Sequence, residues 1–332
     1  MDMKFKNCLF AVVFSILGAS QAQANGFDRC NQSFYNNTPP QVGNPKMAQL
    51  NFPLCFPTFA VNYSGVAKNP IYSAELLTYQ HLVDAKSVSR VDNFREDQRI
   101  PLKYRSLLSD YRGSGMDRGH LSPAGDRKDA DDKDQSFILS NIVPQASYSN
   151  QEGWRLIEEA ARSMVLKTKQ PAYVITGGLY LGKKLRTVGN NVFVPTHTYK
   201  VILFPTTGVV GAWVAVNDDS GRLDVVSVAE LQRFSGMTFF PTLRDTRPLN
   251  YRYMLPLNSK QANKMSAITV SSDNQNSEIF SYMPDKNIKQ KASRNPNEDN
   301  YKKNREELKQ MGSSYSHDVM DAGIGLIKDV LR

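Results

Sequence analysis

The sequence contains little cysteine and, beyond its first residues, no long apolar run. Three Cys among 332 residues, with 40% hydrophobic content, exclude a small disulfide-rich scaffold, a collagen-like fibre and a wholly disordered chain. The longest later apolar stretch, residues 209–216, is far shorter than the roughly 20 residues that cross a bilayer. We therefore expect one large domain or two modest ones, without stable membrane insertion.

The apolar run at the N-terminus has the features of an export signal. Lys4 and Lys6 precede an apolar segment, residues 8–18, and the small residues Ala22 and Ala24 follow on either side of Gln23. A segment of about 11 apolar residues is too short to span a membrane but suits a signal peptide. We expect residues 1–24 to be removed after Ala24, and the mature protein to be secreted or periplasmic.

Charge and cysteine usage describe the mature chain further. The 41 Lys and Arg residues exceed the 32 Asp and Glu residues, which favours encounter with polyanions such as nucleic acid, although many exported proteins are basic. Cys8 leaves with the signal, so Cys30 and Cys55 form an even pair in an oxidising compartment. We expect a disulfide between them that pins residues 25–58 and stabilises the fold by about 2 to 4 kcal/mol.

Hydrophobic patterning predicts an α+β fold in which a mixed, largely antiparallel central sheet is flanked by helices. A hairpin is expected from residue 59 to 72, and strands at 172–176, 192–204 and 209–216. Apolar residues recur at helical spacing between Asn150 and about Lys167. These elements predict a core domain over residues 59–257.

The polar composition from Asn258 onward predicts a mobile C-terminal extension, residues 258–332. Apolar residues at helical spacing within 319–331 predict a short terminal helix that docks or binds a partner. The acidic stretch 126–134 lacks the Gly and Glu of an EF-hand loop and is expected to be solvated. His197 lies in an expected strand and is predicted to be structural.

Two polar clusters carry residues suited to phosphodiester chemistry. His120, in the run Asp117-Arg-Gly-His, can accept a proton from water while it is neutral, and Gly119 allows a substrate to approach closely. An unperturbed imidazole predicts that activity falls below about pH 6.

The predicted helix that begins at Asn150 places Glu158 and Arg162 on the side of Asn150. Amide and carboxylate oxygens suit Mg²⁺, and a guanidinium suits a phosphate. Two structural alternatives remain at this level: Glu158 and Arg162 could form a surface ion pair, and Asn150 could cap its helix.

These motifs resemble the DNA/RNA non-specific endonucleases of the ββα-metal class, which include endonuclease G and secreted sugar-non-specific nucleases. The resemblance covers about residues 59–256 and rests on three blocks: DRGHLSPA at 117–124, SNIVPQ at 140–145, and Asn150 with Trp154 and Glu158. Val143 stands where many relatives have Thr, and Glu152 adds a negative charge beside the third block.

The resemblance implies a role for each matching residue. His120 would be the general base, Asn150 the single direct ligand of a hydrated Mg²⁺, and Glu158 a holder of the metal's water shell. Mn²⁺ would be an acceptable substitute.

The resemblance also implies phosphate contacts and supporting residues. Arg118 and Arg162 would contact phosphate. An upstream arginine would stabilise charge on the phosphate, and Arg90 is preferred to Arg95 for that role. The supporting residues are Asp117, which would support the loop or the water shell of the metal, and Asn141, which would orient its neighbours by hydrogen bonds.

The sequence thus predicts an exported, Mg²⁺-dependent endonuclease that cuts DNA and RNA and leaves 5′-phosphate ends. The alternative is a non-catalytic nucleic-acid-binding protein on the same scaffold, supported by the positive charge. A homodimer and a partner of the C-terminal extension are compatible with the sequence.

Overall fold

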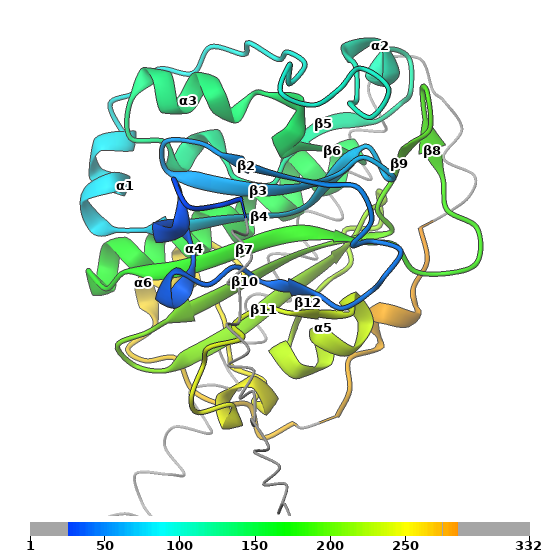
Figure 1. Cartoon of the computed structure of the whole chain (residues 1–332). Coiled ribbons are helices and arrows are strands. Elements are labelled where there is room, and N and C mark those ends of the chain that lie inside the picture. The colour runs from blue at the N-terminus through cyan, green and yellow to red at the C-terminus, as the bar shows by residue number, and fades with distance from the viewer. Residues whose placement is uncertain (1–25, 274, 285–332) are drawn as a thin grey trace, which may run out of the picture.

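A seven-stranded sheet forms the centre of the fold. The computed structural model describes residues 26–273 and 275–284. The strand order is β12-β11-β10-β7-β4-β3-β2, and Figure 1 shows these strands stacked through the molecule. The strand bounds are β2 Asn51–Cys55, β3 Phe59–Ser64, β4 Asn69–Leu77, β7 Ala172–Leu179, β10 His197–Phe204, β11 Val209–Val216 and β12 Leu223–Val226.

The pairing in this sheet confirms the predicted, largely antiparallel core. Each of its strand pairs is antiparallel, including the predicted hairpin β3–β4. A parallel pairing occurs in the described residues only at the isolated bridge between Arg95 and Ile138, so the predicted mixed character is confined to that bridge. The turn between β10 and β11 ends at Gly208, where φ is +72° and glycine carries no steric penalty.

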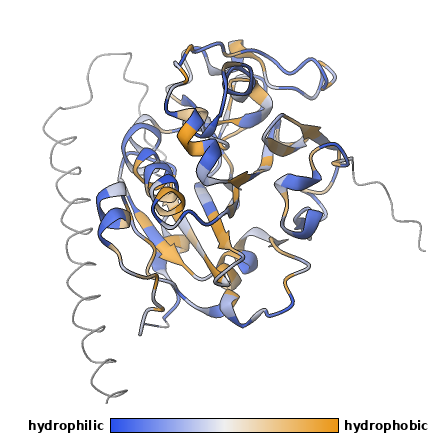
Figure 2. Ribbon diagram, turned by 90° about the vertical axis from the view of Figure 1, so that its left-hand side faces the viewer, coloured by the Kyte–Doolittle hydropathy of each residue, from blue (hydrophilic) through white to orange (hydrophobic). Residues whose placement is uncertain are grey.

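Helices flank the sheet and supply the rest of the core. The longest, α4 (Arg155–Thr168), buries Ile157, Ala161 and Val165, which recur at helical spacing, against the strands. Its predicted apolar face is confirmed. In Figure 2 apolar residues lie on the central strands. The other α-helices are α1 Tyr79–Ala85, α2 Leu108–Tyr111, α3 Ala130–Ser136, α5 Val228–Ser235 and α6 Ser259–Lys264.

Short elements complete the described fold. Two-residue strand pairs join β1 (Gln41–Val42) to β13 (Met237–Thr238) and β8 (Thr187–Val188) to β9 (Val192–Phe193). The short helices are η1 Asn31–Ser33, η2 Tyr35–Asn37, η3 Ala124–Asp126, η4 Leu139–Asn141, η6 Arg247–Asn250 and η7 Glu278–Ser281.

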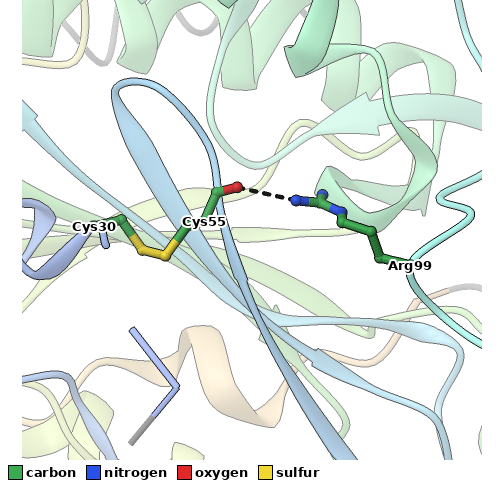
Figure 3. The surroundings of a disulfide bond; sticks show 3 residues. All are labelled: Cys30, Cys55 and Arg99. Atoms are coloured by element: carbon green, nitrogen blue, oxygen red, sulfur yellow. Dashed lines mark hydrogen bonds between the residues drawn. A yellow bond between two sulfur atoms is a disulfide. The ribbon is translucent and has the colours of Figure 1, made fainter. Parts of the chain in front are cut away.

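The predicted disulfide between Cys30 and Cys55 is confirmed (Figure 3). Its two Cα atoms are 5.4 Å apart. Cys55 ends β2, and its carbonyl oxygen accepts a hydrogen bond of 3.0 Å from Nη1 of Arg99. Because β2 is the edge strand beside β3, the N-terminal segment is part of the central sheet.

The packed structure continues past residue 258, where the sequence predicted a mobile extension. Ala262 of α6 and Ile279 and Phe280 of η7 are buried in the main core. Nζ of Lys167 donates to the carbonyl of Asn263 at 2.7 Å, which ties α4 to α6. A few apolar residues in a polar segment therefore suffice to dock residues 258–284, apart from residue 274, onto the sheet.

Two predicted segments cannot be compared with the structure. The signal peptide (1–24) and the terminal helix (319–331) lie outside the described residues. Within the described part of the chain, every helix is too short or too polar to traverse a lipid bilayer.

Candidate active site

A small hairpin followed by a helix carries the three sequence blocks. Strand β5, Asp117–His120, pairs antiparallel with β6, Ile142–Gln145, so that His120 lies opposite Ile142 and Asp117 opposite Gln145. The chain then forms the helical turn η5, Ser149–Trp154, and enters α4. This order, two strands and then a helix, is the predicted ββα arrangement.

The first turn of the predicted helix differs from the expected α-helix. Residues Ser149–Trp154 are π-helical, and α-helical geometry begins at Arg155. The rotation used to align Asn150 with Glu158 therefore does not apply over this turn. Ile157, Ala161 and Val165, which carry the apolar pattern, lie after this turn, so the pattern did not reveal it. Such turns are frequent at functional sites.

Asp117 fixes the orientation of the Asn150 amide. Nδ2 of Asn150 donates to Oδ2 of Asp117 at 3.0 Å, so the amide oxygen points away from that carboxylate. Gln151 donates to the same oxygen at 2.8 Å, and Ser147 donates to Oδ1 at 2.8 Å. Tyr148 already has α-helical backbone angles, and the N–H of Asn150 donates to the carbonyl of Ala146 at 2.8 Å. Asn150 therefore lies inside the helical segment, and the alternative in which it serves only as a cap is wrong.

His120 lies between two aromatic rings, each with an arginine above it. The imidazole centroid is 5.5 Å from that of Phe94 and 4.8 Å from that of Phe137. The guanidinium carbon of Arg118 lies 4.1 Å from the Phe94 centroid, and that of Arg90 lies 5.2 Å from the Phe137 centroid. The structure thus brings the predicted base and two predicted phosphate-binding arginines together through two rings that the sequence motifs did not indicate.

Burial keeps His120 neutral. The side chain is 9% exposed, and desolvation, followed by the charge of Arg90, lowers the pKa of His120 to about 3. Nε2 is buried and has no hydrogen-bond partner among the described residues. The imidazole therefore stays unprotonated to a lower pH than its unperturbed pKa indicated, and on this pKa the loss of activity is expected at a lower pH than 6.

Asn141 holds the backbone that follows His120. Its side-chain oxygen accepts from the Ser122 N–H at 3.0 Å, and its Nδ2 donates to the carbonyls of Ser122 at 2.9 Å and Ser136 at 3.0 Å. The backbone carbonyl of Asn141 also accepts from the N–H of Leu121 at 3.0 Å. These bonds are consistent with the orienting role that the resemblance implied.

Arg162 pairs with a carboxylate to which the sequence motifs gave no such role. Its Nη1 lies 2.8 Å from Oδ1 of Asp126. The structural alternative, a surface ion pair with Glu158, is not formed among the described residues, and Arg162 is mostly covered, with a side chain 21% exposed. Asp126 is buried, as is Asp132, which accepts from Oγ1 of Thr58. The expectation that residues 126–134 are solvated is therefore wrong for these two carboxylates.

Glu158 occupies a desolvated position near charged groups. Burial raises its pKa to about 7, while the nearby cations Lys200 and Arg162 act in the opposite direction. Lys200, in the middle of β10, is 1% exposed, and its Nζ donates to Oγ1 of Thr176 at 2.7 Å. The sequence pattern did not reveal this buried lysine because it lies in an otherwise apolar strand.

The two candidate upstream arginines have different surroundings. Nη2 of Arg95 lies 2.6 Å from Asp134, and its Nη1 donates to the carbonyls of Asn93 and Asp134, both at 3.1 Å. Arg90 pairs with Asp92 at 2.7 Å, and its side chain is 58% exposed. Arg90 lies over Phe137, whose ring adjoins His120, and its charge lowers the pKa of His120, whereas Arg95 is held by Asn93 and Asp134. Of the two, Arg90 is therefore the better candidate for the site.

His197 has a structural environment. It is fully buried, and its ring nitrogens lie 3.0 Å from Oγ1 of Thr196 and 3.0 Å from the carbonyl oxygen of Ile279. Both of its nitrogens are occupied by the fold, which confirms the structural role predicted for it.

The available donors fit a hard, hydrated cation. In the described residues, no group of three or more His, Cys, Asp or Glu side chains could hold a metal. What remains near the hairpin is the oriented amide oxygen of Asn150 and the desolvated carboxylate of Glu158. A cation with few protein ligands and several waters is compatible with this set, and Mg²⁺ has that preference.

Comparisons with known proteins place the site in a family. The family model described as DNA/RNA non-specific endonuclease matches residues 36–246, a span that contains the whole ββα unit. Nuclease C1 of Cunninghamella echinulata var. echinulata is 34% identical over 206 residues, which cover 56% of this chain and 81% of that protein. Human mitochondrial endonuclease G is 32% identical over 222 residues, which cover 61% of this chain and 73% of that protein.

A solved structure is similar as well. One chain from a crystal structure of the EndoG/EndoGI complex aligns with a TM-score of 0.52 and 29% identity, covering 58% of this chain and 86% of that chain. The family match, the relatives and the ββα geometry agree, and the chain belongs to the DNA/RNA non-specific endonuclease family, a family of nucleases that hydrolyse phosphodiester bonds.

Proposed function

We propose that this protein is an exported, Mg²⁺-dependent, sugar-non-specific endonuclease that hydrolyses DNA and RNA to products with 5′-phosphate ends. The observation that supports this most strongly is the hydrogen bond between Asp117 and Asn150. It couples the strand that ends at the buried, neutral His120 to the start of the helix that carries Glu158.

His120 is the general base in this proposal. Its low pKa leaves the imidazole unprotonated at neutral pH, so it can take a proton from the water that attacks phosphorus. Asn141 keeps the following loop in place, while Phe94 and Phe137 limit rotation of the ring. Attack of water with departure of the 3′ oxygen leaves a 5′-phosphate and a 3′-hydroxyl.

Membership of the family implies a divalent metal, and we propose that the ion is Mg²⁺, with Mn²⁺ as a substitute. The Asn150 oxygen would bind it directly, and Glu158 would hold its water through hydrogen bonds. When bound, the ion polarises the phosphate and stabilises the leaving oxygen.

Arginines supply the remaining contacts to phosphate. Arg118 and Arg90 lie over the two rings that flank His120, and Arg162 lies beside Asp126 near Glu158. Guanidinium groups match the oxygens of a phosphate and stay charged at every working pH. We propose that all three contact the scissile group.

Export is part of the proposal and would keep the enzyme away from the genome of its own cell. It rests on the features of residues 1–24 and agrees with the disulfide between Cys30 and Cys55, which suits an oxidising compartment. The secreted and periplasmic locations can be separated by fractionating cells and assaying each fraction for the processed chain.

The test is incubation of the purified mature protein with supercoiled plasmid and with single-stranded RNA, in Mg²⁺ or in excess chelator. We expect both polymers to be cut only with Mg²⁺, and the products to accept a phosphate from polynucleotide kinase only after phosphatase treatment. Binding without cleavage of either polymer would contradict the proposal and favour the non-catalytic alternative. Cleavage in excess chelator would contradict the proposed dependence on a divalent metal.

The homodimer and the partner of the C-terminal extension remain proposals. Because residues 258–284, apart from 274, pack on the core, a truncation that tests the extension should begin at residue 285. Sedimentation of the full mature chain tests the homodimer. If truncation changes neither the activity nor the location of the protein, residues 285–332 have no role in activity or in localisation.

A further inference from the structure

A second group of arginines surrounds a hollow next to the start of β5. Arg112 follows α2, Arg186 precedes β8, and both line a hollow of about 360 Å³. Figure 1 shows α2, β5 and β8 in the same part of the molecule. The sequence motifs assign no role to either arginine.

The Asp110 carboxylate connects the segments around the hollow by hydrogen bonds to two backbone N–H groups. Oδ1 of Asp110 accepts from the N–H of Asn190 at 2.8 Å, and Oδ2 accepts from the N–H of Leu107 at 2.7 Å. Gly189 has φ of +47°, and a Cβ there would lie 2.3 Å from the Cα of Asp110, so only glycine fits this approach. The hollow is therefore preformed, which lowers the entropic cost of binding a ligand.

The hollow adjoins the metal-binding end of the proposed site. Met116 is buried in a cluster with Val188 of β8 and Val192 of β9. The next residue along the chain is Asp117, which orients Asn150. In addition, Nη2 of Arg186 donates to the carbonyl of Ser114 at 3.3 Å. The β8–β9 hairpin is thus packed against the segment that leads into the site.

The charges of this surface are not neutralised within the described residues. Arg112 and Arg186 are exposed, and neither forms an ion pair there. Asp110, the carboxylate that lines the hollow, is buried and accepts from two backbone N–H groups. The loop before β8 also exposes Lys183 and Lys184. Exposed guanidinium groups favour an anionic ligand that offers phosphate oxygens.

We propose that Arg112 and Arg186 bind the phosphodiester backbone of the substrate strand beyond the scissile bond, on the metal side of the site. This surface, called here the flanking-phosphate surface, rests on the proposed function. It increases affinity for long polynucleotides without touching the reacting atoms, because phosphate contacts position a nucleic acid independently of its sequence.

The test compares the full mature chain carrying R112Q/R186Q with the wild type and with K260Q/K264Q. The control removes the same charge from α6, which contacts α4 near Lys167, at the end remote from the site. Dissociation constants for a 40-base-pair duplex would be measured in the His120→Ala background, to prevent cleavage, from 50 to 300 mM KCl. A third variant, R112K/R186K, keeps the charge.

We expect R112Q/R186Q to weaken duplex binding about tenfold at 100 mM KCl. The slope of log affinity against log salt should fall by about 0.7 to 0.9 for each phosphate that is no longer neutralised. The control should stay within about twofold of the parent, and the lysine variant should keep the parent's salt slope because it keeps both charges. With His120 restored, R112Q/R186Q should raise KM for the duplex and leave kcat and the hydrolysis of bis(p-nitrophenyl) phosphate unchanged, since that substrate is too small to reach the surface.

Equal affinity and salt slope in R112Q/R186Q and in the control would overturn the flanking-phosphate surface. Loss of binding in the lysine variant as well would also overturn it, because the arginines would then act through structure and not through charge. Neither result would affect the proposed function, which is tested separately by the Mg²⁺-dependent cleavage of DNA and RNA by the wild-type protein.

Discussion

Asn150 donates from its amide nitrogen to Asp117 at 3.0 Å, and this bond determines which atom of the amide is available to a metal. The two residues come from different blocks of the sequence, 33 positions apart. The helix that begins with a π-helical turn brings Asn150 back onto the strand that starts with Asp117. In the proposed function Asp117 therefore acts through Asn150, as a positioning residue.

The first prediction concerns this bond. Asp117→Ala should raise the Mg²⁺ concentration for half-maximal activity by about 10- to 100-fold, because the amide loses the group that orients it. Gln151→Ala is the matched control, since Gln151 also donates to Asp117 but is expected to bind no metal. Equal Mg²⁺ dependence in the two variants, measured by titration at fixed substrate, would contradict the positioning role.

The second prediction separates Arg90 from Arg95. Arg90→Ala should lower kcat/KM by about 100-fold with little change in stability, because an exposed guanidinium that contacts phosphate contributes a few kcal/mol to transition-state binding. Arg95→Ala should lower the melting temperature, since three hydrogen bonds to Asp134 and Asn93 are lost, and should affect kcat/KM much less. If Arg95→Ala instead lowered kcat/KM and Arg90→Ala lowered the melting temperature, Arg95 would be the arginine that contacts phosphate.

The third prediction concerns pH. Because burial lowers the pKa of His120 to about 3, the base stays unprotonated well into acid. At saturating Mg²⁺, kcat should change less than about threefold between pH 7 and pH 5, whereas a base with the unperturbed pKa near 6.5 would lose most of its activity over this range. A tenfold loss per unit beginning near pH 6 would show that His120 is solvated in the working enzyme.

The same pKa shift affects stability. The unfolded chain protonates His120 near pH 6.5 and the folded chain near pH 3, so the unfolded state binds more protons between these values. The contribution of the neutral imidazole to stability is present above pH 6.5 and is lost as pH falls toward 3. The stability of the wild type relative to His120→Phe should therefore decrease as pH falls from 6.5 toward 3, whichever of the two is more stable at pH 7. Denaturant titrations that show a constant difference over this range would contradict the shift.

The fourth prediction concerns the disulfide. Removal of the bond between Cys30 and Cys55 by C30S/C55S should destabilise the protein by about 3 kcal/mol, as expected for a loop of this size. Since the bond joins the N-terminal segment to the edge strand and lies outside the ββα unit, the activity of the folded fraction should be unchanged. Denaturant melts with and without reductant measure the first effect. A change in kcat would contradict the second.

Much of this architecture could be predicted because it follows from local patterns. Residues 59–72 and 209–216 alternate or run apolar between turn residues, and the structure has strands there. The disulfide could be predicted because two cysteines remain after the expected signal peptide and because an exported protein is expected in an oxidising compartment. His120 and Asn150 were found because their neighbours in sequence form motifs.

The missed features depend on interactions between distant segments. Phe94 lies in an irregular loop, and its position beside His120 is visible only once that loop is folded over β5. Lys200 is one cation in an apolar strand, and nothing local indicates that it lies near Glu158. The packing of residues 258–284, apart from residue 274, was not predicted because the segment is polar and only a few of its residues, such as Phe280, enter the core.

The measurement that tests the account most directly combines Mg²⁺ binding by calorimetry with plasmid cleavage for the wild type, His120→Ala and Asn150→Ala. Because the base and the metal ligand are different residues, we expect His120→Ala to bind Mg²⁺ like the wild type and to cleave at least about 1,000 times more slowly. Asn150→Ala should lose both binding and cleavage. Normal Mg²⁺ binding by Asn150→Ala, or wild-type cleavage by His120→Ala, would contradict the account.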